Sequence, residues 1–152
     1  MKLAASLMRR ADLQNKINEL EIRLRNNARV QEGEKPAEVP ADLLKALETA
    51  FKEYEALVTA INLTNAQPAE DGQTITARIA HRDALMWKQR VLRGFLNEAS
   101  ILAPRSAKTE IRITSSVDVR KLQRQFDNTA KELRECEEKL QEINWTTELI
   151  GL

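Results

Sequence analysis

Few side chains in this 152-residue chain could do catalytic chemistry, and their spacing does not assemble a catalytic site. The one histidine, His81, stands two positions before Asp83. Side chains at positions i and i+2 of a helix do not face each other, so Asp83 cannot orient the imidazole there. No serine or cysteine nucleophile lies near His81 in the sequence. We therefore interpret His81 as a structural or exposed residue and predict a protein without catalytic residues.

The one cysteine, Cys136, is also predicted to be structural. Most of its sequence neighbours are acidic, which disfavours the thiolate form that reactive chemistry needs. A single cysteine and a single histidine cannot make a zinc site. Glu138 and Glu142 share a helix face, but Lys139 and Arg134 interleave with them, which is typical of a solvated face. We predict no metal site and no cofactor.

Basic residues gather in the third quarter of the chain, and the candidate anion contacts among them are Arg78, Arg82, Arg90, Arg93 and Arg105. Such a stripe could hold phosphates, and Trp87 could stack on a base. The net charge of +1, however, is low for a protein that binds polyanions. The favoured interpretation pairs these arginines with acidic residues of other helices or subunits. Nucleic-acid binding is kept as the alternative function.

A second candidate site is a small polar pocket formed by Asn62, Asn65, Asp71, Asn144 and Trp145. It would form if the last helix folds back so that the two polar clusters meet. Asparagine and threonine are also ordinary capping residues, which is the simpler interpretation of both clusters.

The composition indicates the elements that must carry these side chains. Charged residues make up 31% of the chain and aromatic residues 4%, with four glycines and four prolines, which favours long helices over a sandwich or barrel. The length predicts a single domain over residues 1–152. No apolar run approaches the roughly 20 residues of a membrane-spanning helix. The apolar start ends at Arg9-Arg10, too early for a secretory signal, so we expect a soluble cytoplasmic protein.

Apolar residues at alternating steps of three and four predict four helices, at about residues 2–30, 41–65, 75–102 and 117–147. Glycines and prolines separate them, at Gly33, Pro40, Pro68, Gly72 and Pro104. The side chains expected to carry the packing are Leu44, Phe51, Val58, Leu122, Phe126, Leu133 and Leu140. A last helix about 45 Å long would make the molecule elongated.

Alternating polar and apolar residues predict one short strand at about 109–114, before the last helix. A lone strand has unpaired backbone groups. It could pair with the same strand of another subunit or lie as an extended stretch on the bundle, and both remain open. Ser115 or Ser116 is expected to cap the last helix. The predicted fold is all-α, an elongated four-helix bundle of antiparallel coiled-coil helices with this strand.

Six stretches carry a resemblance to a known family: residues 10–14, 27–33, 61–66, 71–72, 117–119 and 144–149. On these the chain resembles a family of small bacterial helical proteins of unknown function, some of which are labelled septicolysin. The resemblance implies a helical cytoplasmic protein with no established activity to transfer. The label implies a cytolysin, although no segment of this sequence would span a bilayer.

These observations favour a non-catalytic cytoplasmic scaffold or protein-interaction module. Narrow apolar seams bury little area per helix, so self-association is expected to complete the core and the protein is predicted to be a homo-oligomer. Docking on an unidentified protein partner is also possible. Nucleic-acid binding is the alternative, and a cytolysin-like function is the weaker one.

Overall fold

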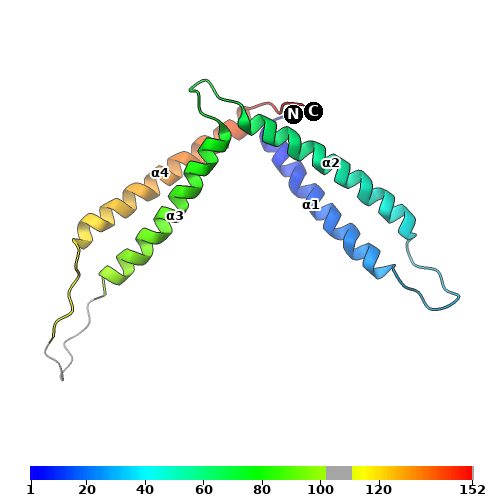
Figure 1. The fold of residues 1–152 in the computed structure, drawn as a ribbon, viewed down its shortest axis with the longest axis horizontal. Coiled ribbons are helices and arrows are strands. Elements are labelled where there is room, and N and C mark those ends of the chain that lie inside the picture. The colour runs from blue at the N-terminus through cyan, green and yellow to red at the C-terminus, as the bar shows by residue number, and fades with distance from the viewer. Residues whose placement is uncertain (102–110, 152) are drawn as a thin grey trace. The chain divides into compact units, whose positions relative to one another are not determined.

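The computed structural model describes residues 1–101 and 111–151. Within them lie four helices, α1 (Leu3–Asn26), α2 (Pro40–Ala66), α3 (Ile75–Ala99) and α4 (Val119–Thr146) (Figure 1). Each begins and ends within a few residues of its predicted bounds, so the all-α prediction is confirmed. The chain divides into two compact units: Met1–Ile75 with Gln141–Leu152 is the first unit, and Thr76–Leu140 is the second.

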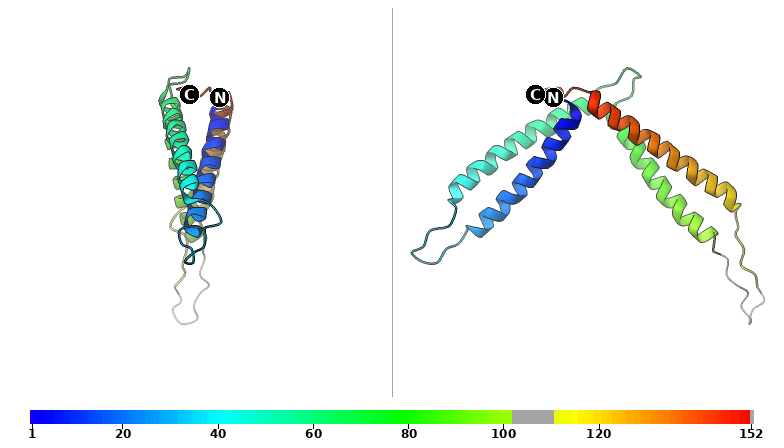
Figure 2. Two further views of the ribbon diagram at one scale, coloured as in Figure 1. Left: turned by 90° about the vertical axis from the view of Figure 1, so that its right-hand side faces the viewer. Right: turned by 180° about the vertical axis from the view of Figure 1, so that it is seen from behind.

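The first unit is built on an antiparallel pair, in which α1 and α2 run side by side (Figure 2). The α1 side chains Leu3, Leu13 and Leu20 are buried. Leu20 forms a core cluster with Leu43 and Ala50 of α2. Ser6, a polar interruption in the pattern, is fully buried because its hydroxyl donates to the carbonyl of Leu3 at 2.7 Å.

The buried face of α2 is not the predicted one. Leu44 and Phe51 were expected in the core, but they are 55% and 48% exposed, and Val58 is half-buried. The buried residues are instead Leu43, Ala50, Leu57, Ala60, Ile61 and Thr64. Two apolar stripes run next to each other on α2, and small alanines on the inner stripe leave room for the leucines of α1. A pattern that counts large apolar residues misses those alanines, so the prediction for Leu44 and Phe51 is wrong.

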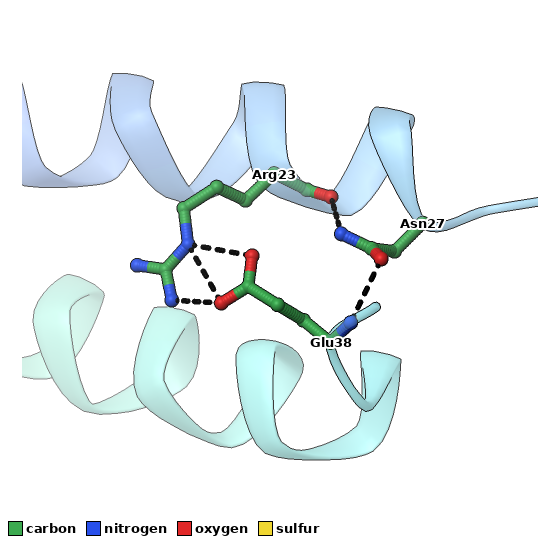
Figure 3. A network of polar contacts seen from close by, with 3 residues as sticks. All are labelled: Arg23, Asn27 and Glu38. Atoms are coloured by element: carbon green, nitrogen blue, oxygen red, sulfur yellow. Dashed lines mark hydrogen bonds and ion pairs between the residues drawn. The ribbon is translucent and has the colours of Figure 1, made fainter. Parts of the chain in front are cut away.

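A polar network fixes the return of the chain from α1 to α2 (Figure 3). The buried Asn27 donates from Nδ2 to the carbonyl of Arg23 at 2.8 Å and accepts the N–H of Glu38 on Oδ1 at 3.0 Å. The Arg23 guanidinium also binds the Glu38 carboxylate, with one N–O distance of 3.0 Å. This hydrogen bond lowers the pKa of Glu38 below its usual value and raises the pKa of Arg23.

The C-terminal tail is held against the start of α1. The N–H of Leu3 donates to the carbonyl of Thr147 at 2.9 Å, and the N–H of Leu149 donates to the carbonyl of Met1 at 2.8 Å. Leu149 is buried. Glu148 pairs with Lys2 at 2.7 Å, and that hydrogen bond, followed by the one from the terminal amine, lowers the pKa of Glu148. The tail therefore belongs to the core of the first unit.

The second unit pairs α3 with α4 (Figure 1). Leu85 and Leu96 are buried on α3, and Leu122, Thr129, Leu133 and Leu140 are buried on α4. The predicted seam of α4 is therefore confirmed, with Phe126 half-buried beside the guanidinium of Arg93, 5.6 Å from its ring centre. The half-buried Cys136 points its Sγ at the carbonyl of Arg78 at 3.7 Å, which agrees with its predicted packing role.

Two predictions before α4 need correction. The expected strand at 109–114 lies partly outside the described residues, and residues 111–114 form no strand. Ile111 and Ile113 are 70% and 57% exposed, because no partner strand in the described residues pairs with them. The cap of α4 is Asp118, whose Oδ1 accepts the N–H groups of Arg120 and Lys121 at 3.1 and 3.2 Å.

Candidate interaction surface

The side of α3 that faces away from α4 carries a second apolar seam. We call it the outer seam of α3, and it consists of Ala80, Ala84, Trp87, Val91, Gly94 and Phe95. All of these residues are exposed, with Trp87 at 64% and Val91 at 57%. The first five follow steps of four and three, which places them on one face of the helix. Within the second unit, α3 thus has two apolar faces, and α4 covers the other one.

A hollow of 360 Å³ lies on this seam, lined by Ala84, Trp87, Lys88, Val91 and Leu92. Its wall is apolar except for Lys88. A large apolar side chain of a partner would fill the hollow and cover the indole of Trp87.

The exposed stripe on α2 is the second candidate surface. We call it the outer stripe of α2, and it consists of the exposed Leu44 and Phe51 and the half-buried Val58, spaced seven residues apart. Glu48 and Glu55 lie one turn after Leu44 and Phe51, on the solvent side of the stripe. Lys52 pairs with Glu48 at 3.5 Å. The edge of this stripe is therefore acidic, with one lysine partly offsetting it.

The two helices that carry these surfaces have opposite charge. On α3, five basic residues outnumber two acidic ones, giving +3: Arg78, Arg82, Lys88, Arg90 and Arg93 against Asp83 and Glu98. On α2, four acidic residues outnumber two lysines, giving −2: Asp42, Glu48, Glu53 and Glu55 against Lys45 and Lys52. Glu53 is already paired with Arg9 of α1. Beside the exposed apolar faces themselves, Lys88 flanks one side of the outer seam of α3 and Arg90 flanks the other side together with Asp83, whereas Glu48 and Glu55 flank the outer stripe of α2.

The arginines predicted to hold phosphates are partly engaged within the second unit. Arg82 pairs with Asp83 at 2.8 Å, and Arg93 lies over the Phe126 ring. Arg78 is half-buried, Arg90 is exposed, and Arg105 lies outside the described residues. A phosphate would have to compete with the contacts of Arg82 and Arg93. Nucleic-acid binding through this set stays a prediction.

The residues that were predicted to form a polar pocket lie in different environments of the first unit. Asn62 and Trp145 are exposed, and Asn65 and Asn144 are half-buried. The Asp71 carboxylate accepts the N–H of Gln73 at 3.1 Å within its own turn. The contact that joins the end of α2 to the tail comes from another residue, the buried Thr64, whose hydroxyl accepts the N–H of Ile150 at 3.0 Å. The pocket stays a prediction.

Within residues 1–101 and 111–151, no three or more His, Cys, Asp or Glu side chains are grouped so that they could hold a metal ion. His81 is exposed, in agreement with its interpretation from the sequence. None of the helices in this described part combines the length and the apolar character needed to cross a membrane.

Residues 10–149 match a family of unknown function, DUF6847. The chain belongs to this family. It is also similar to a functionally unknown conserved protein from Corynebacterium diphtheriae, known from a crystal structure. The two share 33% sequence identity over 98% of each chain, with a TM-score of 0.82. A comparison with curated proteins gave no match. Membership of a helical family of unknown function is thus confirmed, and neither match carries the septicolysin label.

The outer seam of α3 was not predicted from the sequence, in which Trp87 was interpreted alone, as a residue that could stack on a base. The missed signal is the regular spacing of Ala80 and Ala84 with Trp87 and Val91. Because two residues of that series are small alanines, the hydrophobic pattern of the second seam is weaker than that of the first.

Proposed function

We propose that this protein is a non-catalytic helical interaction module of the cytoplasm that associates with copies of itself. The observation that carries the proposal is the outer seam of α3, where Trp87, Val91 and Phe95 are each about half or more exposed on one helix face. Contiguous apolar patches on soluble proteins commonly mark interaction sites. A partner that covers this seam completes the packing that α4 provides on the other face.

Tryptophan strengthens this interpretation because it is one of the residue types that contribute most to binding energy at protein interfaces. Trp87 is 64% exposed and stands beside an apolar hollow of 360 Å³. The side chains around it are alanine, valine and leucine, together with the stem of Lys88. This surrounding suits a side chain from a partner better than it suits a polar small molecule.

The proposal is tested by light scattering on a sizing column over a series of protein concentrations. The chain mass is 17.3 kDa, and we expect the measured mass to rise to a multiple of it as the concentration enters the micromolar range. Replacing Trp87 with serine should shift the rise to higher concentration. The same change at Trp145, which is 57% exposed outside the seam, is the matched control. A mass of 17.3 kDa at every concentration contradicts the proposal.

Nucleic-acid binding is the rival function, and the same sample tests it. It predicts that labelled RNA or DNA oligonucleotides bind at low salt, with an affinity that falls steeply as salt rises. Because Arg82 and Arg93 are engaged by Asp83 and Phe126, we expect no binding. Binding that is lost when Arg78 and Arg82 are both replaced by glutamate would support the rival.

A further inference from the structure

The outer seam of α3 and the outer stripe of α2 complement each other in charge, spacing and shape. Resting on the self-association proposed above, we propose that the outer seam of α3 in one copy packs against the outer stripe of α2 in a second copy. In a two-fold dimer this contact forms twice, because each copy offers both surfaces.

Charge selects this pairing over the pairing of like helices. If α3 packed on α3 of a second copy with Trp87 and Val91 at the centre, Lys88 and Arg90 would meet their own counterparts. If α2 packed on α2 of a second copy, Glu48 and Glu55 would meet the same glutamates of that copy. Residues that flank a helical seam set the choice of partner through such attractions and repulsions. Packing α3 on α2 instead places the positive Lys88 at the flank of one helix near the negative Glu48 and Glu55 at the flank of the other.

The spacing of the apolar residues along the two surfaces is compatible as well. Leu44, Phe51 and Val58 repeat every seven residues, and so do Ala84 with Val91 and Ala80 with Trp87. Matching seven-residue repeats allow side chains of one helix to insert between side chains of the other over several turns. The two surfaces can therefore stay in contact along their length.

Shape explains the small residues of the outer seam. A shallow, wide-open hollow of about 360 Å³, lined by Ala84, Trp87 and Val91 among others, offers room to a large side chain such as Phe51 of a second copy. Gly94 lies on the same seam, and apart from its two neighbours and the backbone of its own helix no atom of the described residues comes within 4 Å of where its Cβ would be. No other element of the described residues therefore packs on Gly94, which leaves room for a partner helix to approach.

The area of the two surfaces is of the order that a dimer needs. A fully covered aromatic side chain buries about 150–250 Å². Trp87, Phe95 and Phe51 are 64%, 47% and 48% exposed, so covering them removes on the order of 300 Å² per copy. A two-fold dimer doubles this area, and Leu44, Val91 and the charged edges add to it. The total approaches the about 1,200 Å² at the lower end of specific interfaces.

The pairing is tested by cross-linking single cysteines placed at the edges of the two surfaces. Cys136 is first replaced by serine, and Glu55→Cys and Lys88→Cys are then made in separate chains that carry different tags. Both sites are exposed, so the apolar contact and the fold are left intact. The two proteins are mixed and treated with a short bis-maleimide. A Glu21→Cys chain, altered on the exposed side of α1, is the control partner for Lys88→Cys.

We expect cross-linked dimers with both tags from the mixture of Glu55→Cys and Lys88→Cys, and few from either protein alone or from the control mixture. Dimers from Lys88→Cys alone would show α3 on α3 and overturn the inference. A chain that carries both cysteines and cross-links within itself, at the mass of a monomer, would overturn it too. A dimer in light scattering without the mixed cross-link refutes this pairing and leaves the proposed self-association standing.

A charge exchange gives a second readout. Lys88→Glu should weaken self-association by roughly fivefold, the size expected for losing an exposed ion pair. Adding Glu55→Lys to that chain should restore most of the affinity, because the two edges again have opposite sign. A double variant that associates no better than Lys88→Glu alone would contradict the pairing.

Discussion

Adjacent leucines on α2 give a matched test of which stripe faces α1. Leu43 is 5% exposed and lies in the cluster with Leu20 and Ala50, whereas Leu44 is 55% exposed on the outer stripe. Truncating either leucine to alanine removes the same atoms from the same helix. The two variants therefore differ only in the packing that is lost.

The expected magnitudes follow from burial. Truncating a buried leucine costs about 2–5 kcal/mol, because both burial and packing are lost, and we expect about 3 kcal/mol for Leu43→Ala. For Leu44→Ala we expect less than about 1 kcal/mol, since most of the side chain already contacts water. In a chain of this length the Leu43 change should lower Tm by roughly 6–12 °C.

Urea unfolding followed by circular dichroism measures this difference. At protein concentrations low enough for monomers, the midpoint should fall much further for Leu43→Ala than for Leu44→Ala. At higher concentration the loss for Leu44→Ala should grow, because association stabilises the folded chain by mass action. Equal losses, or a larger loss for Leu44→Ala in the monomer, would refute the assignment of the inner and outer stripes.

Three further predictions concern single interactions. Hydrogen bonds from Arg23 and Lys2 lower the pKa values of Glu38 and Glu148, respectively. The two carboxylates therefore stabilise the fold at pH values above 4.5, the ordinary carboxyl pKa, and this stabilisation is lost as the pH falls through the lowered pKa values. A Glu38→Gln, Glu148→Gln chain should thus be less stable than the parent at neutral pH and converge with it in acid, as urea midpoints against pH would show. Asp118→Ala should cost about 1 kcal/mol in urea unfolding, because two N–H groups of α4 lose their acceptor, whereas an unchanged midpoint would argue against this cap. Gly94→Ala should add about 1 kcal/mol to the stability of the monomer, since beyond its own helix nothing in the described residues lies within 4 Å of the added methyl, and a destabilised monomer would contradict this.

Much of the fold was predictable because long helices leave a strong periodic signal. The seam of α4 repeats over many turns with leucine at Leu122, Leu133 and Leu140, and all three are buried as predicted. The strand was predicted wrongly in its described part because alternation of Ile111 and Ile113 is a local signal. A strand needs a partner, and four residues of sequence do not say whether one exists.

The interaction surface was harder to predict because α2 and α3 each have two apolar faces. Periodicity shows that a helix has an apolar face, but it does not say which of two faces the neighbouring helix covers. On α2 the larger residues Leu44 and Phe51 suggested the core, while the structure packs α1 against Leu43 and Ala50. The inner stripe of α2 mixes leucine with alanine, as at Leu43, Ala50 and Leu57, and alanine contributes little to a hydrophobic pattern although it permits close helix packing.

Self-association through the exposed apolar faces is tested most directly by sedimentation equilibrium of the parent chain beside Val91→Asp. A charge at Val91 would be buried in the proposed contact, and an unpaired buried charge is costly. Ile22→Asp, at a 59% exposed position of α1, is the control. We expect the parent and the control to approach twice 17.3 kDa in the micromolar range, with Val91→Asp remaining at 17.3 kDa. A parent chain that stays at 17.3 kDa, or a Val91→Asp chain that dimerises as well as the parent, would contradict the account.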